Sequence, residues 1–137
     1  MTNALPNPRW TILVVDDEPE VLRLFKRILS TENAEILAAQ TGTLALGIAR
    51  KTRLDLVILD VKLPDMSGTE VLRRLRSIDD GVPVIMATSY GSAETIRASM
   101  RLGALDYLTK PFDNQEVRRV AREALASRAR GPIPLRA

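Results

Sequence analysis

The 137-residue sequence contains no cysteine and no histidine, and only 4% of its residues are aromatic. Without cysteine the chain cannot form disulfides or thiolate metal sites. No apolar run approaches the roughly 20 residues that a helix needs to cross a bilayer. Residues 1–8 lack the charged and apolar regions of a signal peptide. We therefore expect a cytoplasmic protein that does not enter a membrane.

Charge is distributed unevenly along the chain. The net formal charge is +3, and all of this excess lies in residues 113–137, which carry six arginines against three acidic residues. A solvated helix face explains the excess better than a nucleic-acid-binding stripe, because aromatic residues that could stack on bases are few. We expect no direct contact with nucleic acid.

Short apolar runs alternate with amphipathic segments over most of the chain. The runs predict buried strands at 11–15, 34–38, 54–59, 83–87 and 104–109. An apolar stripe at helical spacing follows each run. Strands that alternate with helices imply right-handed crossovers and a parallel sheet covered on both faces. For five strands we predict an α/β, flavodoxin-like (βα)5 fold, a doubly wound sheet in the order 2-1-3-4-5.

The sequence is long enough for one domain with a substantial core. We expect a flexible lead over residues 1–9, the single domain over 10–127, and a tail or the start of a linker over 128–137. The predicted buried stripes include Leu44 in the second helix and Met100 in the fourth.

A carboxylate, a hydroxyl or an ammonium group follows each of four predicted strands. Asp16 and Asp17 follow the first strand, Asp60 the third, Thr88 the fourth and Lys110 the fifth. Each has an ordinary explanation by itself; an Asp-Asp pair before a helix, for example, is commonly an N-cap. Because the carboxyl ends of parallel strands meet at one rim of the sheet, where ligands bind, their joint occurrence indicates a site.

Three carboxylates at one rim repel each other, so the pKa of one would rise unless a cation joined them. Oxygen ligands without histidine or cysteine suit a hard ion, Mg²⁺ or Mn²⁺. Such an ion, with Lys110 and the hydroxyl of Thr88, is suited to stabilising a phosphoryl group in transfer. Asp60, at the centre, can supply the nucleophile as a carboxylate that forms an acyl phosphate.

At these residues the sequence resembles the receiver domain of two-component response regulators. The resemblance covers about residues 10–127. It is carried by Val15-Asp16-Asp17-Glu18-Pro19, Leu59-Asp60-Val61-Lys62-Leu63-Pro64-Asp65-Met66-Ser67-Gly68, Ala87-Thr88-Ser89 and Lys110-Pro111-Phe112. Residues 91–95 and 101–112 look most like receivers attached to sigma-54 activators.

This resemblance implies that Asp60 accepts a phosphoryl group from the phosphohistidine of a sensor histidine kinase or a histidine phosphotransfer protein. Asp16, Asp17 and Asp60 would hold Mg²⁺, with the backbone carbonyl of Lys62 as a further ligand. The chain would be a signalling module and not an enzyme, although it would take part in its own phosphorylation and dephosphorylation.

The resemblance also assigns roles to other residues of the rim. Thr88 and Lys110 would bind the phosphoryl oxygens, and a cis peptide bond between Lys110 and Pro111 would aim the lysine. Tyr107 would be the switch aromatic, whose ring turns inward as Thr88 moves toward the phosphate; otherwise it is an ordinary half-buried strand residue. The switch would act on a surface around the fourth helix and fifth strand.

Two positions are hypothesised to slow hydrolysis of the acyl phosphate. Lys62 and Tyr90, which lies two places after Thr88, would crowd the path of the attacking water. The alternative for Lys62 is a solvated loop residue. The expected partners beyond the kinase are a downstream protein or an absent output domain, and a homodimer through the fourth helix, fifth strand and last helix is compatible with the family.

Other readings of the same residues are weaker. A Mg²⁺-dependent phosphohydrolase with an aspartyl nucleophile resembles a pattern with Asp-x-Asp on its first strand, whereas Asp16 and Asp17 are adjacent. A flavodoxin-type carrier would need a phosphate loop where Asp16-Asp17-Glu18-Pro19 would repel an anion. Whether the chain is a stand-alone receiver or part of a longer regulator stays open.

Overall fold

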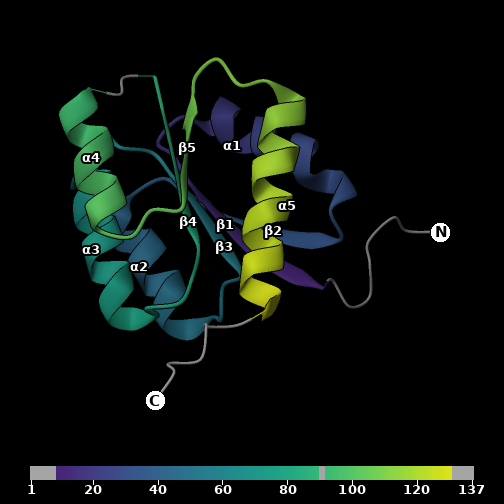
Figure 1. Ribbon diagram of the computed structural model, residues 1–137, viewed down its shortest axis with the longest axis horizontal. Helices are drawn as coiled ribbons and strands as arrows, with labels where there is room; N and C mark the ends of the chain where they lie inside the picture. Colours follow the sequence, from purple (N-terminus) through teal and green to yellow (C-terminus); the bar gives the residue numbers. More distant parts are fainter. Residues whose placement is uncertain (1–8, 90–91, 131–137) are drawn as a thin grey trace.

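The computed structural model describes residues 9–89 and 92–130. Within them, one parallel sheet has the strand order β2-β1-β3-β4-β5, which confirms the predicted topology (Figure 1). Its strands are β1 (Trp10–Val15), β2 (Ala34–Ala39), β3 (Leu56–Leu59), β4 (Val84–Thr88) and β5 (Asp106–Thr109). The helices are α1 (Pro19–Ile28), the 3₁₀ helix η1 (Leu29–Thr31), α2 (Gly42–Lys51), α3 (Gly68–Ile78), α4 (Ala93–Arg101) and α5 (Asn114–Arg130).

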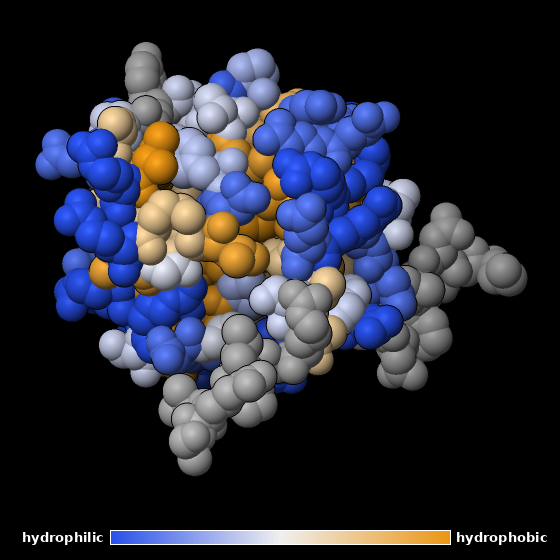
Figure 2. All heavy atoms as spheres, viewed as in Figure 1, coloured by the Kyte–Doolittle hydropathy of each residue, from blue (hydrophilic) through white to orange (hydrophobic). Residues whose placement is uncertain are grey.

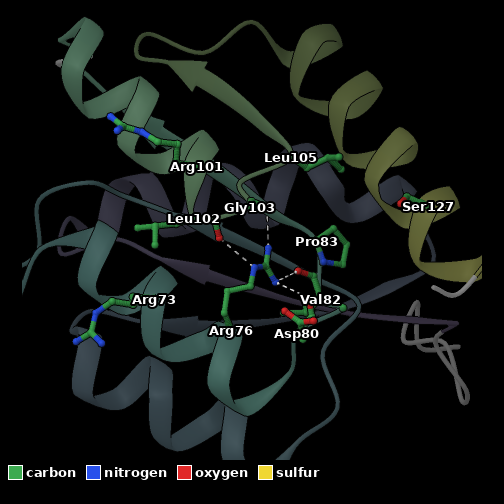
Figure 3. Close-up of a pocket in the computed structure, with 11 residues that line it drawn as sticks. Arg73, Arg76, Asp80, Val82, Pro83, Arg101, Leu102, Gly103, Leu105 and Ser127 are labelled. Atoms are coloured by element: carbon green, nitrogen blue, oxygen red, sulfur yellow. Dashed lines mark hydrogen bonds between the residues drawn. The ribbon is translucent and has the colours of Figure 1, made fainter. Parts of the chain in front are cut away.

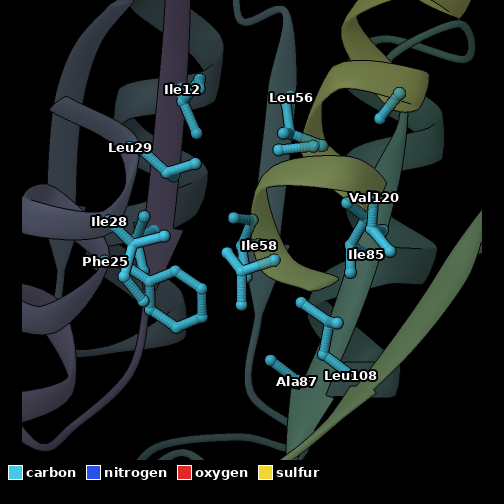
Figure 4. Close-up of a cluster of buried hydrophobic side chains, with 14 of the residues drawn as sticks. Ile12, Phe25, Ile28, Leu29, Leu56, Ile58, Ile85, Ala87, Leu108 and Val120 are labelled. Atoms are coloured by element: carbon cyan, nitrogen blue, oxygen red, sulfur yellow. The ribbon is translucent and has the colours of Figure 1, made fainter. Parts of the chain in front are cut away.

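The alternation of side chains along the strands produces two cores, one on each face of the sheet. Alternate residues of β1, such as Ile12 and Val14, pack with α1 and α5, and Figure 4 shows this cluster around Phe25 and Ile58. Their neighbours in β1 and β3 pack with α2, α3 and the segment that follows α4 in the second cluster. With both faces covered, the central strands are buried throughout, and only the strand ends can present polar groups.

The prediction that Leu44 and Met100 are buried was wrong, and Ala93, which belongs to the same predicted stripe as Met100, is exposed as well. Leu44 is 57% exposed and Met100 is 46% exposed. In α4 the buried position is Ser99, whose hydroxyl donates to the carbonyl of Thr95 at 2.9 Å and so needs no polar partner outside its own helix. In α2 the buried positions are Ala45 and Leu46. Both helices are therefore rotated relative to the stripe that their apolar residues predicted.

Side-chain caps fix where the helices begin. Thr41, Ser67 and Ser92 each accept a hydrogen bond from the backbone N–H three residues later, at the starts of α2, α3 and α4. Gly103 follows α4 with φ +93°, a left-handed conformation that glycine commonly supplies after the end of a helix.

The last helix runs beyond the predicted domain end at residue 127. Arg128 is held in place by ionic and hydrogen-bond contacts, because its guanidinium donates to Asp79 at 2.5 Å and to the carbonyl of Leu54 at 3.1 Å. The described part of α5 therefore extends to Arg130. None of the described helices combines the length and apolar composition that a bilayer span requires.

Candidate functional site

Asp16 and Asp60 meet because β1 and β3 are neighbours. Val15 pairs with Leu59 in the last rung of this ladder, and the N–H of Asp60 donates to the carbonyl of Val15 at 3.0 Å. Each aspartate is the next residue after its strand. Both are buried, with exposures of 2% for Asp16 and 5% for Asp60.

Lys110, which follows the edge strand β5, contacts both aspartates. Its Nζ lies 2.9 Å from Asp16 Oδ2 and 3.3 Å from Asp60 Oδ2. Its backbone N–H donates to the carbonyl of Thr88 at 2.9 Å, which fixes the end of β5 to the end of β4. The peptide bond between Lys110 and Pro111 is cis, as predicted. The ends of β1 and β3 thus meet at the ammonium group of Lys110, and the end of β4 is bonded to the backbone of the same residue.

Asp17 and Glu18 extend the acidic cluster toward solvent. Carboxylate oxygens of Asp16, Asp17 and Glu18 all lie within 4.8 Å of one another. Asp60 is joined to this group through Lys110, which also approaches Glu18 at 3.4 Å. Glu18 was not predicted as a site residue; the signal available in the sequence was its place directly after Asp17.

The cluster carries an excess of negative charge. Four carboxylates (Asp16, Asp17, Glu18 and Asp60) gather around the ammonium of Lys110, and these five groups together carry a formal charge of −3. Burial raises the pKa of Asp16 despite its hydrogen bonds from the Glu18 N–H and from Lys110, and the charge of Asp60 raises it further. Burial alone would lower the pKa of Lys110, but the hydrogen bond to Asp16 and the two aspartate charges raise it. Burial thus favours the neutral form of Asp16, while the two aspartates favour the charged form of Lys110.

Two further predicted residues, Thr88 and Lys62, lie beside this cluster. Thr88 is buried, 3% exposed, at the end of β4. The side chain of Lys62 is exposed, while its backbone N–H lies 3.3 Å from Asp60 Oδ1 and donates to it. Tyr90 lies outside the described residues.

The side chain of Tyr107 packs against the core cluster that contains α2 and α3, and its hydroxyl oxygen is buried. Within residues 9–89 and 92–130 this hydroxyl has no hydrogen-bond partner. Burial raises the pKa of Tyr107, and the charge of Asp60 adds to the effect. The tyrosine side chain is therefore turned into the molecule, and not toward solvent.

A hollow of about 510 Å³ lies at the opposite, amino-terminal end of the sheet. Figure 3 shows that the guanidinium of Arg76 points into it. This group donates to the carbonyls of Val82 at 2.6 Å, Gly103 at 2.9 Å and Leu102 at 3.3 Å. Arg76 therefore ties α3 to the segments before β4 and after α4, and the hollow is separate from the carboxylate cluster.

This fold, with acids and a lysine at the carboxyl rim of the sheet, agrees with the family to which the sequence is matched. Residues 12–122 match the response regulator receiver domain, so the chain belongs to this family of two-component signalling proteins. Neither a phosphohydrolase nor a flavodoxin-type carrier is favoured by this match.

Individual relatives give the same result. The chain is 40% identical to sporulation initiation phosphotransferase F of Bacillus subtilis (strain 168), over 83% of this chain and 92% of that protein. It is 36% identical to regulatory protein AtoC of Escherichia coli (strain K12), over 83% of this chain but only 25% of that protein, in line with the predicted likeness to receivers of sigma-54 activators. A crystal structure of a CheY-like response regulator receiver domain protein from Methanospirillum hungatei JF-1 superposes with a TM-score of 0.86 at 32% identity, covering 90% of this chain and 98% of that one.

Proposed function

We propose that Asp60 is the phosphoacceptor and that its donor is the phosphohistidine of a sensor histidine kinase or a histidine phosphotransfer protein. The observation that carries this proposal is the contact of one lysine with two buried aspartates at the ends of neighbouring strands, 2.9 Å from Asp16 and 3.3 Å from Asp60. An isolated carboxylate would be a poor nucleophile beside an anionic phosphoryl group. Lys110 removes part of that repulsion.

In the transfer, a bond forms between an Asp60 oxygen and phosphorus while the phosphorus–nitrogen bond of the phosphohistidine breaks. Lys110 and the hydroxyl of Thr88 would bind the phosphoryl oxygens as the bond forms. The transferred group stays on Asp60 until water hydrolyses the acyl phosphate, and no other substrate is turned over. We therefore regard the protein as a signalling module and not as an enzyme.

The donor set fits a divalent ion, Mg²⁺ or Mn²⁺. Asp16, Asp17 and Asp60 would hold it together with the carbonyl of Lys62, and the formal charge of −3 would fall to −1. The pKa of Asp16 is raised mainly by burial, which is a cost that a neighbouring cation would offset. The bound ion would neutralise charge on the phosphoryl oxygens.

We propose that the signal leaves through the face of α4, β5 and α5. Figure 2 shows apolar side chains on this face, between the charged surfaces of α4 and α5. Met100 and Leu105 are the large apolar residues exposed near β5, at 46% and 45%. Thr88 and Tyr107 would couple this face to the phosphorylated site, because Thr88 ends β4 and Tyr107 lies in β5, the strand that pairs with β4.

This apolar face suits a downstream protein, an output domain or a second copy of the chain. TcrX of Mycobacterium tuberculosis (strain ATCC 25618 / H37Rv), a probable transcriptional regulatory protein, is 45% identical over 107 residues, and the chain spans 46% of its length. We propose a receiver over residues 10–127 that either acts alone or controls a further domain. Its location in the cytoplasm stays a prediction.

Incubation with acetyl phosphate and Mg²⁺, followed by intact-mass measurement, tests the acceptor. We expect one added phosphoryl group on the wild-type chain and none on Asp60→Ala. Asp55→Ala is the matched control, because Asp55 lies at the opposite end of β3 and accepts from the Thr11 N–H at 2.9 Å. If wild type takes up no phosphoryl group with metal present, or if Asp60→Ala still does, the proposal is wrong.

A further inference from the structure

The loop between β3 and α3 is closed at its base. Lys62 and Ser67 form an antiparallel bridge, and the N–H of Gly68 donates to the carbonyl of Val61 at 2.6 Å. At the same base, the backbone N–H of Lys62 donates to Asp60 Oδ1. The position of this loop therefore determines where the backbone of Lys62 lies relative to the acceptor.

The tip of the loop is fastened to the start of α2 by Asp65. Its Oδ1 accepts from the N–H of Gly42 at 2.8 Å, and its Oδ2 accepts from the N–H of Thr43 at 2.8 Å and from the hydroxyl of Thr43 at 2.6 Å. Thr41, the N-cap residue of α2, accepts instead from the N–H of Leu44. Asp65 and Thr41 thus satisfy different N–H groups of the same helix end.

The charge of Asp65 fits this position. The hydroxyl of Thr43, and then the N–H groups of Gly42 and Thr43, lower the pKa of Asp65 to about 2. The side chain is therefore ionised at neutral pH, and a negative charge at a helix N-terminus is favourable.

Close packing holds the loop on both sides. A Cβ on Gly42 would lie 2.6 Å from Met66 Cγ, and a Cβ on Gly68 would lie 2.1 Å from the carbonyl oxygen of Asp60. Only glycine permits both approaches. The loop is consequently seated between the start of α2 and the backbone of the acceptor residue.

We propose that Asp65 is a positioning residue, which holds the loop on α2 so that the Lys62 backbone stays in place beside Asp60 for the metal. This inference rests on the proposed function, since Lys62 supplies a carbonyl ligand there. Without the three bonds of Asp65 the tip is released, and the entropy of the freed loop must be lost again when the metal binds.

Mg²⁺ titration by isothermal calorimetry, with Asp65→Ala compared to Thr41→Ala, tests the proposal. Both variants remove a capping side chain from α2, and we expect both to lower the melting temperature. For Asp65→Ala we expect the Mg²⁺ dissociation constant to rise about threefold to tenfold, below the range for a residue that directly supports a metal ligand. For Thr41→Ala it should stay within about twofold of wild type, because the loop contacts remain. Asp65→Asn keeps only one acceptor oxygen, so its Mg²⁺ dissociation constant should lie between those of wild type and Asp65→Ala.

Wild-type affinity in Asp65→Ala, or an equal loss in Asp65→Ala and Thr41→Ala, would overturn the proposal. Amide hydrogen exchange without metal gives a second readout. The amide of Lys62 should exchange faster in Asp65→Ala than in wild type, and its exchange rate should be unchanged in Thr41→Ala. If wild type binds no Mg²⁺, the proposed function fails, and the exchange rate of Lys62 still decides whether Asp65 holds the loop.

Discussion

Removal of the charge of Asp16 should abolish stabilisation of the fold by Mg²⁺. Asp16 Oδ2 and Asp60 Oδ2 both contact Lys110 Nζ, at 2.9 and 3.3 Å, so these oxygens lie no more than about 6.2 Å apart. At an effective dielectric constant of about 20, two unit charges at that distance repel by roughly 2.7 kcal/mol. A divalent ion between them offsets this repulsion only while both carboxylates are present.

The expected magnitude follows from mass action. At a Mg²⁺ concentration ten times the dissociation constant, binding to the folded state adds about 1.4 kcal/mol to the free energy of unfolding. For a domain of roughly 120 residues this corresponds to about 5 °C in melting temperature. In Asp16→Asn this increase should fall to about 1 °C or less.

Without metal, Asp16→Asn should be more stable than wild type at neutral pH. The pKa of Asp16 in the folded protein is raised above its ordinary value of 3.8, mainly by burial. Folding therefore favours the protonated acid, and wild type loses stability as the pH rises through this higher pKa. Below pH 3.8 the side chain is neutral in both states, so the advantage of the amide should disappear.

Calorimetric melting in EDTA and in Mg²⁺, repeated from pH 3 to 8, measures both effects. Glu123→Gln is the control, because it removes one carboxylate charge from the exposed face of α5. If Mg²⁺ raised the melting temperature of Asp16→Asn as much as that of wild type, Asp16 would not hold the ion.

Three further outcomes are expected. Lys62→Ala should shorten the lifetime of the phosphorylated form, measured by loss of the intact-mass adduct, if the side chain obstructs water; an equal or longer lifetime would contradict this. Gly68→Ala should lower the free energy of unfolding by about 1–3 kcal/mol in urea and slow phosphorylation, because its Cβ would meet the Asp60 carbonyl oxygen at 2.1 Å; unchanged values would show that the backbone relaxes freely. Asp79→Ala should lower the free energy of unfolding by about 1–2 kcal/mol, because it leaves Arg128 without its carboxylate partner. This value allows for the partial exposure of Asp79 to solvent.

The Asp79 effect should depend on pH. Burial by itself would raise the pKa of Asp79, but the hydrogen bond from Arg128 and further contacts lower this pKa below 3.8. Its contribution is therefore complete above that pH and is lost as the pH falls through the lower value of the folded state. Urea unfolding at pH 7 and pH 2.5 should show a larger difference between wild type and Asp79→Ala at the higher pH.

The strands, their order and the residues at their ends could be predicted from the sequence. Buried parallel strands need nearly continuous apolar runs, and a polar residue that follows such a run must lie at the rim of the sheet. Asp16, Asp60 and Lys110 met that condition, and the structure brings them together. Strand starts were less predictable: β3 begins at Leu56 and not at 54, since Asp55 accepts from the N–H of Thr11 through its side chain.

The orientation of the helices was decided by tertiary packing. Leu44 and Met100 have the spacing of buried residues, but Ser99 occupies the buried position in α4 because its hydroxyl bonds to a carbonyl of its own helix. A polar side chain satisfied in this way can be buried at little cost, and apolar periodicity alone does not reveal it.

By itself, the sequence determined which residues stand at the carboxyl rim, because the apolar pattern of each strand dictates where its polar end must be. Only the tertiary structure decided which of these groups touch, that Glu18 joins them, and that Asp65 binds the start of α2, 22 and 23 residues away in the chain. Contacts of that kind depend on distances between separate elements, and no local pattern of residues encodes them.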